Sequence, residues 1–528
     1  MHRLLIYSLL VGSSFAFQFP FNIPIFKSKD SALIEEAHAS PRIAIIGAGA
    51  GGSSAAFWIS KAKEKFGIDV EIDVYERSDY VGGRSTVVYP YNDTTLAPLE
   101  LGASIFVDAN KNLMRASKEF NLTLTTFEDD NSDTGIWDGQ NFVLVIESGS
   151  YVKSWWATLK VLWRYGYTAP TRTKAIVQSM IDRFLGLYTP DSPRWDDISA
   201  LSERLQSVSM TNQTASDFLE GNGVAPLFAR ELVEAATRVN YGQNVDKIHA
   251  LGGAISMAAS GASGVAAGNF LLFEKFLENS TAKVFLNTNV KEIRRKSGSS
   301  LWTVHTSAGS QTYKGVVLAA PFHQTDIILP SDLAELIPPQ PYVPLHVTYL
   351  TTRSEHPRPE YFGLASDAQV PATILSTYEG ARAGGVEPEF NSISYHGKVR
   401  KMEGAEGDAV TDPEWTVKIF SKERVSDEWL EKVFGNVGWV YRKLWQAYPV
   451  LLPTTEFPPV KLDQGFYYVN AFEPFISTME TETIASRNIV DLLLHEEFGT
   501  GICGSLLSET ENATQIAAPA DFVLGWDC

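Results

Sequence analysis

A glycine-rich turn between a buried strand and a helix constrains the fold of this 528-residue chain more than any other feature. Residues 41–46 read PRIAII, a continuous run rich in β-branched residues that is typical of a parallel strand buried on both faces. Gly47, Gly49 and Gly52 follow with the spacing G-x-G-x-x-G, and a helical pattern covers 53–65. Such glycines let backbone N–H groups approach a diphosphate, which the helix N-terminus stabilises. The turn therefore predicts a dinucleotide-binding βαβ unit.

A second buried strand completes this unit. Residues 70–75 read VEIDVY and lead into Glu76 and Arg77. Glu76 stands about 24 residues beyond Gly52, close to the position where an acidic side chain binds the ribose in dinucleotide folds. We expect Glu76 and Arg77 to lie beside the bound dinucleotide. NAD and FAD both use this unit, so these residues leave the choice between them open.

A second glycine loop favours FAD. Residues 81–84 read VGGR and resemble the glycine-glycine-arginine element of the flavin amine oxidase and prenylcysteine oxidase group. In that group the loop faces the FAD diphosphate, and a planar guanidinium suits phosphate oxygens. Residues 99–104 resemble the group's next strand, which passes the flavin ring. The resemblance implies four further cofactor-binding residues, namely Gly83, Arg84, Gly102 and Ala103.

Later segments resemble the remaining cofactor elements of the same group, in the same order along the chain. Val290 matches a valine whose backbone meets the adenine, and residues 316–321 match a strand that returns to the sheet. Residues 468–473 end on Glu473, and Met479 opens a helix. The resemblance places this acidic residue and this helix N-terminus at the flavin end of FAD.

Residues 238–243, RVNYGQ, narrow the resemblance to the prenylcysteine oxidase family. The arrangement matches that family from about residue 43 to the helix that ends near residue 498. One departure is SGVAAGN at 263–269, where the family usually has a Trp ahead of Gly-Gly-Asn. His249 is expected to be structural rather than a base. No catalytic side chain is identified, and the candidates for the junction of substrate and flavin are Asn240, Tyr241, Gln243 and Asn269.

The resemblance implies a reaction in which non-covalently bound FAD oxidises the thioether of farnesyl- or geranylgeranyl-cysteine. With O2 and water, the products are a prenyl aldehyde, cysteine and hydrogen peroxide. Aromatic residues at helical spacing are more often core, but five of them are candidates for the wall of a prenyl tunnel, namely Trp155, Trp156, Trp163, Tyr165 and Tyr167. Two alternatives stay open: a flavin amine or polyamine oxidase, and a non-catalytic prenyl-binding protein of the Rab GDP-dissociation-inhibitor kind.

The expected fold class is α/β, or α+β overall, with a glutathione-reductase-like FAD-binding Rossmann domain and an inserted, partly helical substrate lobe. The predicted FAD-binding domain is discontinuous and comprises residues 41–110, 275–330 and 460–498. The predicted substrate lobe comprises residues 111–274 and 331–459. A signal peptide (1–16), a spacer (17–40) and a C-terminal tail (499–528) complete the predicted organisation.

Several features indicate the secretory pathway. Residues 1–16 combine a short basic start, an apolar run and small residues near a cleavage site. The chain has two cysteines, Cys503 and Cys528, which we expect to pair in an oxidising compartment. Five N-x-S/T sequons are candidate glycosylation sites, at Asn92, Asn121, Asn212, Asn279 and Asn512. A vacuole, a lysosome-like compartment or the cell exterior would each fit.

The composition of the chain argues against nucleic-acid-binding proteins and proteins with cysteine-based metal sites. The formal net charge of −18 argues against nucleic acid and against an anionic membrane surface as partners. Two cysteines are too few for a cysteine-based metal or iron–sulfur site, so no metal is expected. No segment is long and apolar enough to predict a transmembrane helix. The expected partners are therefore the amphipathic small-molecule substrate and O2.

Overall fold

The computed structural model describes residues 40–126, 133–147, 151–259, 261–402, 413–504, 519 and 521–528, and the side chains of 151–157 lie outside this description. Contacts divide the chain into two units, Met1–Ser40 and Pro41–Cys528, and the elements of secondary structure belong to the second. The predicted signal peptide and spacer, and the sequon at Asn512, lie outside the described residues.

A six-stranded sheet forms the nucleotide-binding layer, in the order β19-β20-β13-β1-β2-β9. Five of its strands are parallel, and β19 joins the edge antiparallel to β20. The strands are β1 (Arg42–Ile46), β2 (Glu71–Tyr75), β9 (Lys283–Phe285), β13 (Gly315–Leu318), β19 (Lys461–Asp463) and β20 (Phe466–Tyr468). β1 lies inside the sheet and is almost completely buried, as its apolar run predicts.

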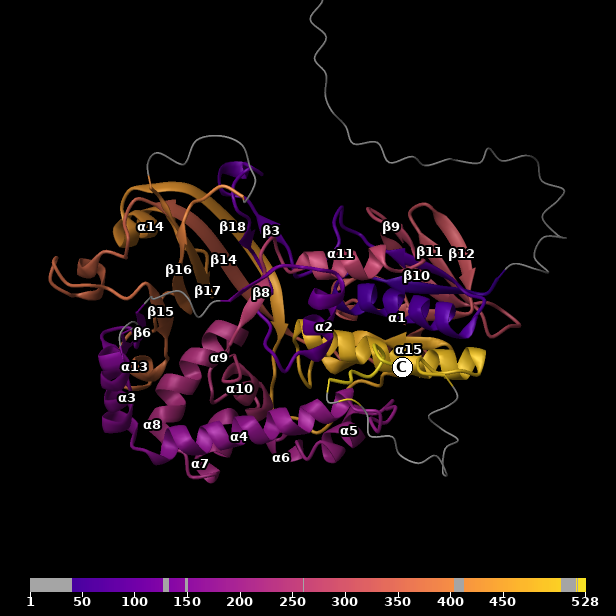
Figure 1. Cartoon of the computed structure of the whole chain (residues 1–528), viewed down its shortest axis with the longest axis horizontal. Helices are drawn as coiled ribbons and strands as arrows, with labels where there is room; N and C mark the ends of the chain where they lie inside the picture. Colours follow the sequence, from indigo (N-terminus) through magenta and orange to yellow (C-terminus); the bar gives the residue numbers. More distant parts are fainter. Residues whose placement is uncertain are drawn as a thin grey trace, which may run out of the picture. The chain divides into compact units, whose positions relative to one another are not determined.

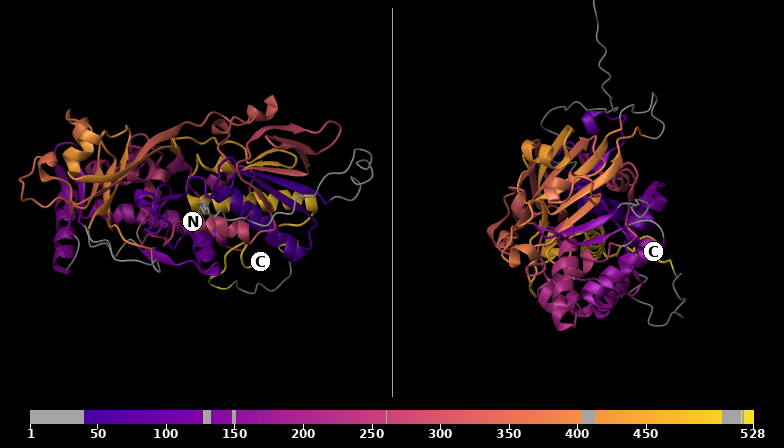
Figure 2. Two further views of the ribbon diagram at one scale, coloured as in Figure 1. Left: turned by 90° about the horizontal axis from the view of Figure 1, so that it is seen from above. Right: turned by 90° about the vertical axis from the view of Figure 1, so that its left-hand side faces the viewer.

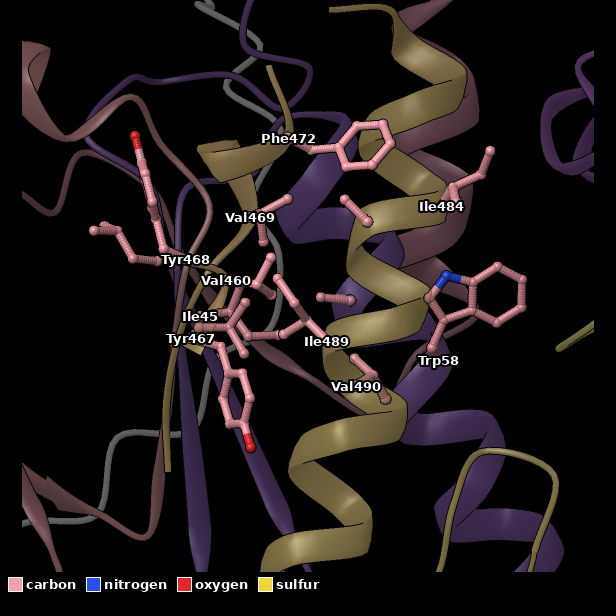
Figure 3. Close-up of a cluster of buried hydrophobic side chains, with 14 of the residues drawn as sticks. Ile45, Trp58, Val460, Tyr467, Tyr468, Val469, Phe472, Ile484, Ile489 and Val490 are labelled. Atoms are coloured by element: carbon pink, nitrogen blue, oxygen red, sulfur yellow. The ribbon is translucent and has the colours of Figure 1, made fainter. Parts of the chain in front are cut away.

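Two long helices, α1 (Ala50–Phe66) and α15 (Met479–Phe498), lie side by side against this sheet (Figure 1). Figure 3 shows the core that they share, with Ile45 of β1 and Ile489 of α15 between the sheet and the helix. Two more helices, α2 (Lys111–Glu119) and α11 (Phe270–Glu278), pack on α15 and α1. The predicted domain boundaries assign α2 and the first residues of α11 to the substrate lobe. In the structure both helices pack on the helices of the nucleotide-binding layer.

A three-stranded antiparallel sheet follows β9 in the chain and extends the nucleotide-binding part (Figure 1). It consists of β10 (Val290–Arg295), β11 (Trp302–Thr306) and β12 (Gly309–Tyr313). The indole of Trp302 is buried and donates to the backbone oxygen of Gln464 at 3.0 Å, which fixes this sheet against the β19–β20 turn. Small pairs elsewhere are β3 (Val87–Val88) with β4 (Leu99–Glu100), and β5 (Leu124–Thr126) with β8 (Ser263–Val265).

The second large sheet has seven strands in the order β18-β14-β17-β16-β15-β6-β7. These are β6 (Thr134–Trp137), β7 (Phe142–Ile146), β14 (Tyr342–Thr352), β15 (Thr373–Ser376), β16 (Ser392–Lys398), β17 (Trp415–Ser421) and β18 (Val437–Pro449). Helices gather on one side of it (Figure 2). They are α3 (Tyr151–Tyr165), α4 (Thr168–Leu185), α5 (Ile198–Arg204), α6 (Val208–Thr211), α7 (Ala215–Gly221), α8 (Pro226–Phe228), α9 (Glu234–Tyr241) and α10 (Ala250–Ser256). Short helices α12 (Ser331–Ala334), α13 (Glu379–Arg382) and α14 (Asp427–Phe434) connect the strands.

The C-terminal residues return to the nucleotide-binding layer. Cys503 and Cys528 form a disulfide with their Cα atoms 4.9 Å apart. Trp526 packs edge-to-face on Trp58 of α1, with ring centroids 5.2 Å apart. The disulfide therefore closes a loop whose end is also fixed by aromatic packing.

Candidate active site

One cavity of about 820 Å³ runs from the glycine turn to the seven-stranded sheet. It lies at the carboxyl ends of the parallel strands, which is where open α/β sheets bind ligands. Residues from both predicted halves of the chain line it, including Gly49, Glu76, Met180, Lys418 and Glu473.

The glycines of the first turn have distinct roles. Gly47 has φ +107°, and a Cβ there would stand 2.5 Å from the backbone oxygen of Ala319. A Cβ at Gly52 would stand 1.8 Å from the oxygen of Gly47, so the fold itself excludes side chains at both positions. At Gly49 the nearest protein atom to an added Cβ is 3.8 Å away, and Gly49 lines the cavity. The protein therefore leaves space for a Cβ at Gly49, and a side chain there would clash with a ligand bound in the cavity.

Glu76 and Arg77 lie at the end of β2, beside the cavity. The Glu76 carboxylate is buried and accepts hydrogen bonds from the backbone N–H groups of Ala48 (2.9 Å) and Ser78 (2.8 Å). Arg77 is exposed and donates to the backbone oxygen of Gln324 at 2.9 Å. Glu76 thus fixes the glycine turn and lines the cavity at the same time.

The second glycine loop lies against the first. Gly82 donates its backbone N–H to the oxygen of Ala48 at 3.0 Å, and Gly83 has φ +60°. A Cβ at Gly102 would stand 1.8 Å from the oxygen of Arg84, so this strand passes too close to the loop for a side chain. The cavity lining from this region includes Gly83, Arg84, Gly102 and Ala103, and across the cavity Val290 and Met479.

Arg84 was predicted to face the diphosphate, and in the structure it contacts groups of the protein itself. Its guanidinium forms an ion pair with Glu473 and donates to the backbone oxygen of Ala447 at 2.9 Å. The other Glu473 oxygen accepts from the hydroxyl of Tyr342, and burial together with this carboxylate raises the pKa of that phenol. Arg84 and Glu473 both line the cavity, but each is the other's principal partner.

The residues present fit a bound dinucleotide. The N-termini of α1 and α15 both meet the cavity, and the first backbone N–H groups of a helix have no partner within it. Glu482 Oε1 and Asn470 Oδ1, from two residues that line the cavity, are buried without a hydrogen-bond partner. The backbone N–H groups at these two helix starts, beside a Gly49 that carries no side chain, are what a diphosphate-containing ligand requires.

Beyond this cradle the cavity has an apolar wall. Its residues come from the C-terminal half of α4 and from α10 with the turn that follows, namely Met180, Ile181, Phe184, Leu185, Ile255, Ala258 and Ala259. The described aromatic candidates for the wall of a prenyl tunnel do not line the cavity. Trp163 and Tyr167 are 89% and 73% exposed, and buried Tyr165 donates to Glu231 at 2.8 Å. Trp155 and Trp156 lie outside the described side chains.

The seven-stranded sheet lines another part of the cavity with both apolar and polar residues, and the apolar ones include Leu345, Val347, Phe420 and Trp445. β16 contributes Ser392, Ser394 and His396, which alternate along the strand, and β17 contributes Lys418. The Lys418 ammonium donates to the backbone oxygen of Glu100 (2.7 Å) and to Ser104 Oγ (2.9 Å). Burial lowers the pKa of Lys418 to about 8 and raises that of the Glu100 carboxyl to about 7. Sequence reasoning missed this part of the cavity, although the alternation in SISYHGK is a visible signal.

The predicted junction residues divide into two pairs. Asn240 and Tyr241 line the cavity, and the Tyr241 hydroxyl donates to the backbone oxygen of Ser477 at 3.3 Å. Gln243 and Asn269 are not among the residues that line it. Gln243 bonds to the backbone of Tyr241, Pro449 and Leu451.

Asn269 is a fully buried structural bridge. Its amide nitrogen donates to the oxygen of Ala103 at 3.0 Å, and its amide oxygen accepts from the N–H of Val265 at 2.8 Å. The backbone N–H of Asn269 donates to the carboxylate of Glu100. Asn269 therefore positions the strand that passes the cavity without facing it.

His249 is structural, as the sequence indicates. It is fully buried, caps α10 by accepting the N–H of Gly252 at 3.0 Å, and contacts the oxygen of Pro474 at 3.2 Å. Burial lowers the pKa of this imidazole to about 4.

In the part of the chain that the structure describes, no group of His, Cys, Asp and Glu side chains is arranged to hold a metal ion. Among the same residues, no helix has the length and apolar character needed to cross a membrane. Four sequon asparagines, Asn92, Asn121, Asn212 and Asn279, are exposed.

Comparison with known proteins places the chain in a family. The prenylcysteine lyase family matches residues 150–501, and an NAD(P)-binding Rossmann-like domain matches residues 45–120. The chain is 30% identical to farnesylcysteine lyase of Arabidopsis thaliana over 505 residues, which cover 92% of this chain and 94% of that protein. It is 29% identical to prenylcysteine oxidase 1 of Homo sapiens over 485 residues, 86% of this chain and 89% of the relative.

Solved structures share the fold at low identity. A putrescine oxidase double mutant superposes with a TM-score of 0.55 at 14% identity, over 86% of this chain and 99% of that one. Cyclohexylamine oxidase of Brevibacterium oxydans gives a TM-score of 0.54 at 15% identity, over 85% and 97% of the two chains. These likenesses concern the fold alone, and they confirm the predicted Rossmann architecture. The family match confirms the resemblance seen at residues 238–243: the chain belongs to the prenylcysteine lyase family.

Proposed function

We propose that this protein is an FAD-dependent oxidase that cleaves the thioether of S-prenyl-cysteine. Water and O2 are consumed, and a prenyl aldehyde, free cysteine and hydrogen peroxide are released. The observation that carries this proposal is one cavity that joins a dinucleotide cradle to a chamber lined by apolar side chains and by the ammonium of Lys418. An amphipathic thioether is the kind of substrate that such a chamber fits.

FAD, when bound, supplies the oxidation by taking a hydride from the prenyl carbon next to sulfur and passing the electrons to O2. The protein's own residues orient the substrate. The apolar residues of α4, such as Ile181 and Phe184, hold the isoprenoid chain, which buries its surface away from water. Ser394 and Lys418 of the seven-stranded sheet face the cysteine head.

Lys418 is the natural partner for the cysteine carboxylate. Two of the three ammonium hydrogens are used by Glu100 and Ser104, so one is left for a ligand. Burial raises the pKa of the nearby Glu100 carboxyl, which weakens its ability to cancel this charge. Binding at both ends of the substrate holds the carbon–sulfur bond between them, where proximity lowers the barrier.

The cofactor assignment has a direct test. Both cysteines are engaged in the disulfide at the C-terminus, which supports non-covalent binding. The purified protein should be yellow, and denaturation followed by filtration should release all of the flavin. A colourless protein would favour a non-catalytic prenyl-binding role, and colour retained by the polypeptide would contradict non-covalent binding.

We also propose that the protein enters the secretory pathway and works in a vacuole, a lysosome-like compartment or outside the cell. The leader-like residues 1–16, the exposed sequon asparagines and the Cys503–Cys528 pair support this. Non-reducing peptide mapping of material from the native host should recover the disulfide peptide and glycans on the exposed sequons. Two free thiols and unmodified asparagines would point to the cytosol instead.

A further inference from the structure

Glu482 is an unusual carboxylate in the first turn of α15. Its side chain lines the cavity, yet the residue is only 7% exposed. Oε1 has no hydrogen-bond partner, and the sole partner of Oε2 is the amide of Asn470 at 3.5 Å. A Cβ built on Gly51 would stand 3.3 Å from Oε2, so this carboxyl lies directly beside the N-terminus of α1.

The surroundings of Glu482 do not neutralise a negative charge. The titratable groups that face it are Glu473, from the segment after β20, Arg84 of the second glycine loop, and Tyr468 of β20. Arg84 is already paired with Glu473 and bound to Ala447. On α1 the residue beside the Glu482 carboxyl is Gly51, within a stretch without charged side chains (AGGSSAA, residues 50–56).

A buried carboxyl without a cation takes up a proton, because the neutral form has a smaller desolvation cost. Burial and repulsion from Glu473 accordingly raise the pKa of Glu482 well above its ordinary value. Glu480, two residues earlier, shows the contrast. Its two oxygens accept from the N–H groups of Asn112 and Leu113 at the start of α2, so its hydrogen bonds are already formed within the protein.

We propose that Glu482 acts as a neutral carboxylic acid that donates a hydrogen bond to a diphosphate oxygen of the bound dinucleotide. This inference rests on the proposed binding of FAD. The glycine turn directs the diphosphate to the N-terminus of α1, where Glu482 lies. An ionised carboxylate there would repel the phosphate charge, whereas a protonated carboxyl supplies a hydrogen-bond donor.

The test compares the holoprotein with the variants Glu482→Gln, Glu482→Ala and Glu480→Gln. Serial dilution with detection of free FAD fluorescence gives the dissociation constant, and infrared spectroscopy detects a protonated carboxyl by its C=O stretch. Glu482→Gln keeps a neutral donor, so it should bind FAD within about threefold of the wild type, and Glu482→Ala should bind about tenfold more weakly. Other buried carboxyls such as Glu100 absorb in the same region, so the comparison is of intensity: the carboxylic acid band should be weaker in Glu482→Gln than in the wild type, and unchanged in Glu480→Gln.

Three outcomes would overturn the inference. One is a holoprotein without a carboxylic acid band, and another is a band that is as intense in Glu482→Gln as in the wild type. The third is a Glu482→Gln variant that binds FAD as weakly as Glu482→Ala. A wild type without affinity for FAD would instead refute the proposed function, and with it the role of Glu482. The two failures are therefore distinguishable in one titration.

Discussion

The ammonium of Lys418 donates to the backbone oxygen of Glu100 at 2.7 Å and so ties β17 of the substrate sheet to β4 beside the nucleotide-binding layer. This contact places a cation in the wall of the cavity that the glycine turns and the apolar helices also line. The effects that we expect from substitutions of cavity residues follow from this shared lining.

Replacing Lys418 by Met should weaken binding of the substrate carboxylate. The loss of one charge-assisted hydrogen bond costs about 1.5 to 3 kcal/mol, so the KM for farnesylcysteine should rise about 10- to 100-fold with a smaller change in kcat. Because the protonated form binds and burial lowers the pKa to about 8, the wild-type KM should rise as the pH passes above 8. The methyl ester of farnesylcysteine, which lacks the carboxylate, is the control. An ester as sensitive to Lys418→Met as the acid would contradict the carboxylate role.

Gly49→Val should yield a folded protein without flavin. A side chain at this position meets no protein atom closer than 3.8 Å at its Cβ, but it projects into the cavity. The absorbance ratio of flavin to protein and the circular dichroism spectrum measure the two effects separately. Gly52→Ala is the matched control, because its Cβ would meet the oxygen of Gly47 at 1.8 Å and should destabilise the fold itself. Normal flavin content in Gly49→Val would refute the assignment of the cradle.

Ile181→Trp should shorten the prenyl chain that the site accepts. Ile181 lies in the apolar wall, and a larger side chain there removes space at the isoprenoid end. The ratio of kcat/KM for geranylgeranylcysteine to that for farnesylcysteine should fall about tenfold, which corresponds to about 1.4 kcal/mol. Trp163→Ala, on the exposed surface of α3, should leave this ratio unchanged. A ratio that Ile181→Trp does not alter would place the prenyl chain elsewhere.

Because of His249, the free energy of unfolding should decrease as the pH falls. Its pKa of about 4 in the folded protein lies below the unfolded value of about 6.5, so the unfolded chain binds the proton more readily as the pH falls from 6.5 towards 4. The folded state should lose about 2 kcal/mol between about pH 7 and pH 5 from this residue alone. Urea unfolding of wild type and His249→Asn at both pH values tests this, since Asn can still cap α10. An equal loss in both proteins would exclude His249 as the cause.

Local patterns predicted the cradle well. The roles of Gly47 and Gly52, the strand before them and the position of Glu76 all depend on residues close together in sequence, where backbone geometry dictates the residue type. The ion pair of Arg84 with Glu473 spans 389 positions and depends on how α15 returns to the sheet. Sequence reasoning placed both residues at the cavity, but it could not show that they pair with each other.

The substrate chamber was harder to predict for the same reason. Ser394 and Lys418 face the cavity because β16 and β17 pair antiparallel in one register, which no local pattern reveals. Asn269 was assigned to the site because it lies in a family-like segment, yet its partner Ala103 is 166 positions away and turns it into a bridge. Aromatic residues of α3 suggested a tunnel, whereas α4 supplies the apolar wall.

The most direct test of the proposed function is peroxide release from the purified holoprotein with farnesylcysteine, compared with spermine. The proposed reaction predicts one hydrogen peroxide and one free thiol for each farnesylcysteine consumed, with the prenyl aldehyde as the second organic product. We expect no peroxide from spermine. Oxidation of spermine without activity on farnesylcysteine would make the protein an amine oxidase and contradict the substrate assignment.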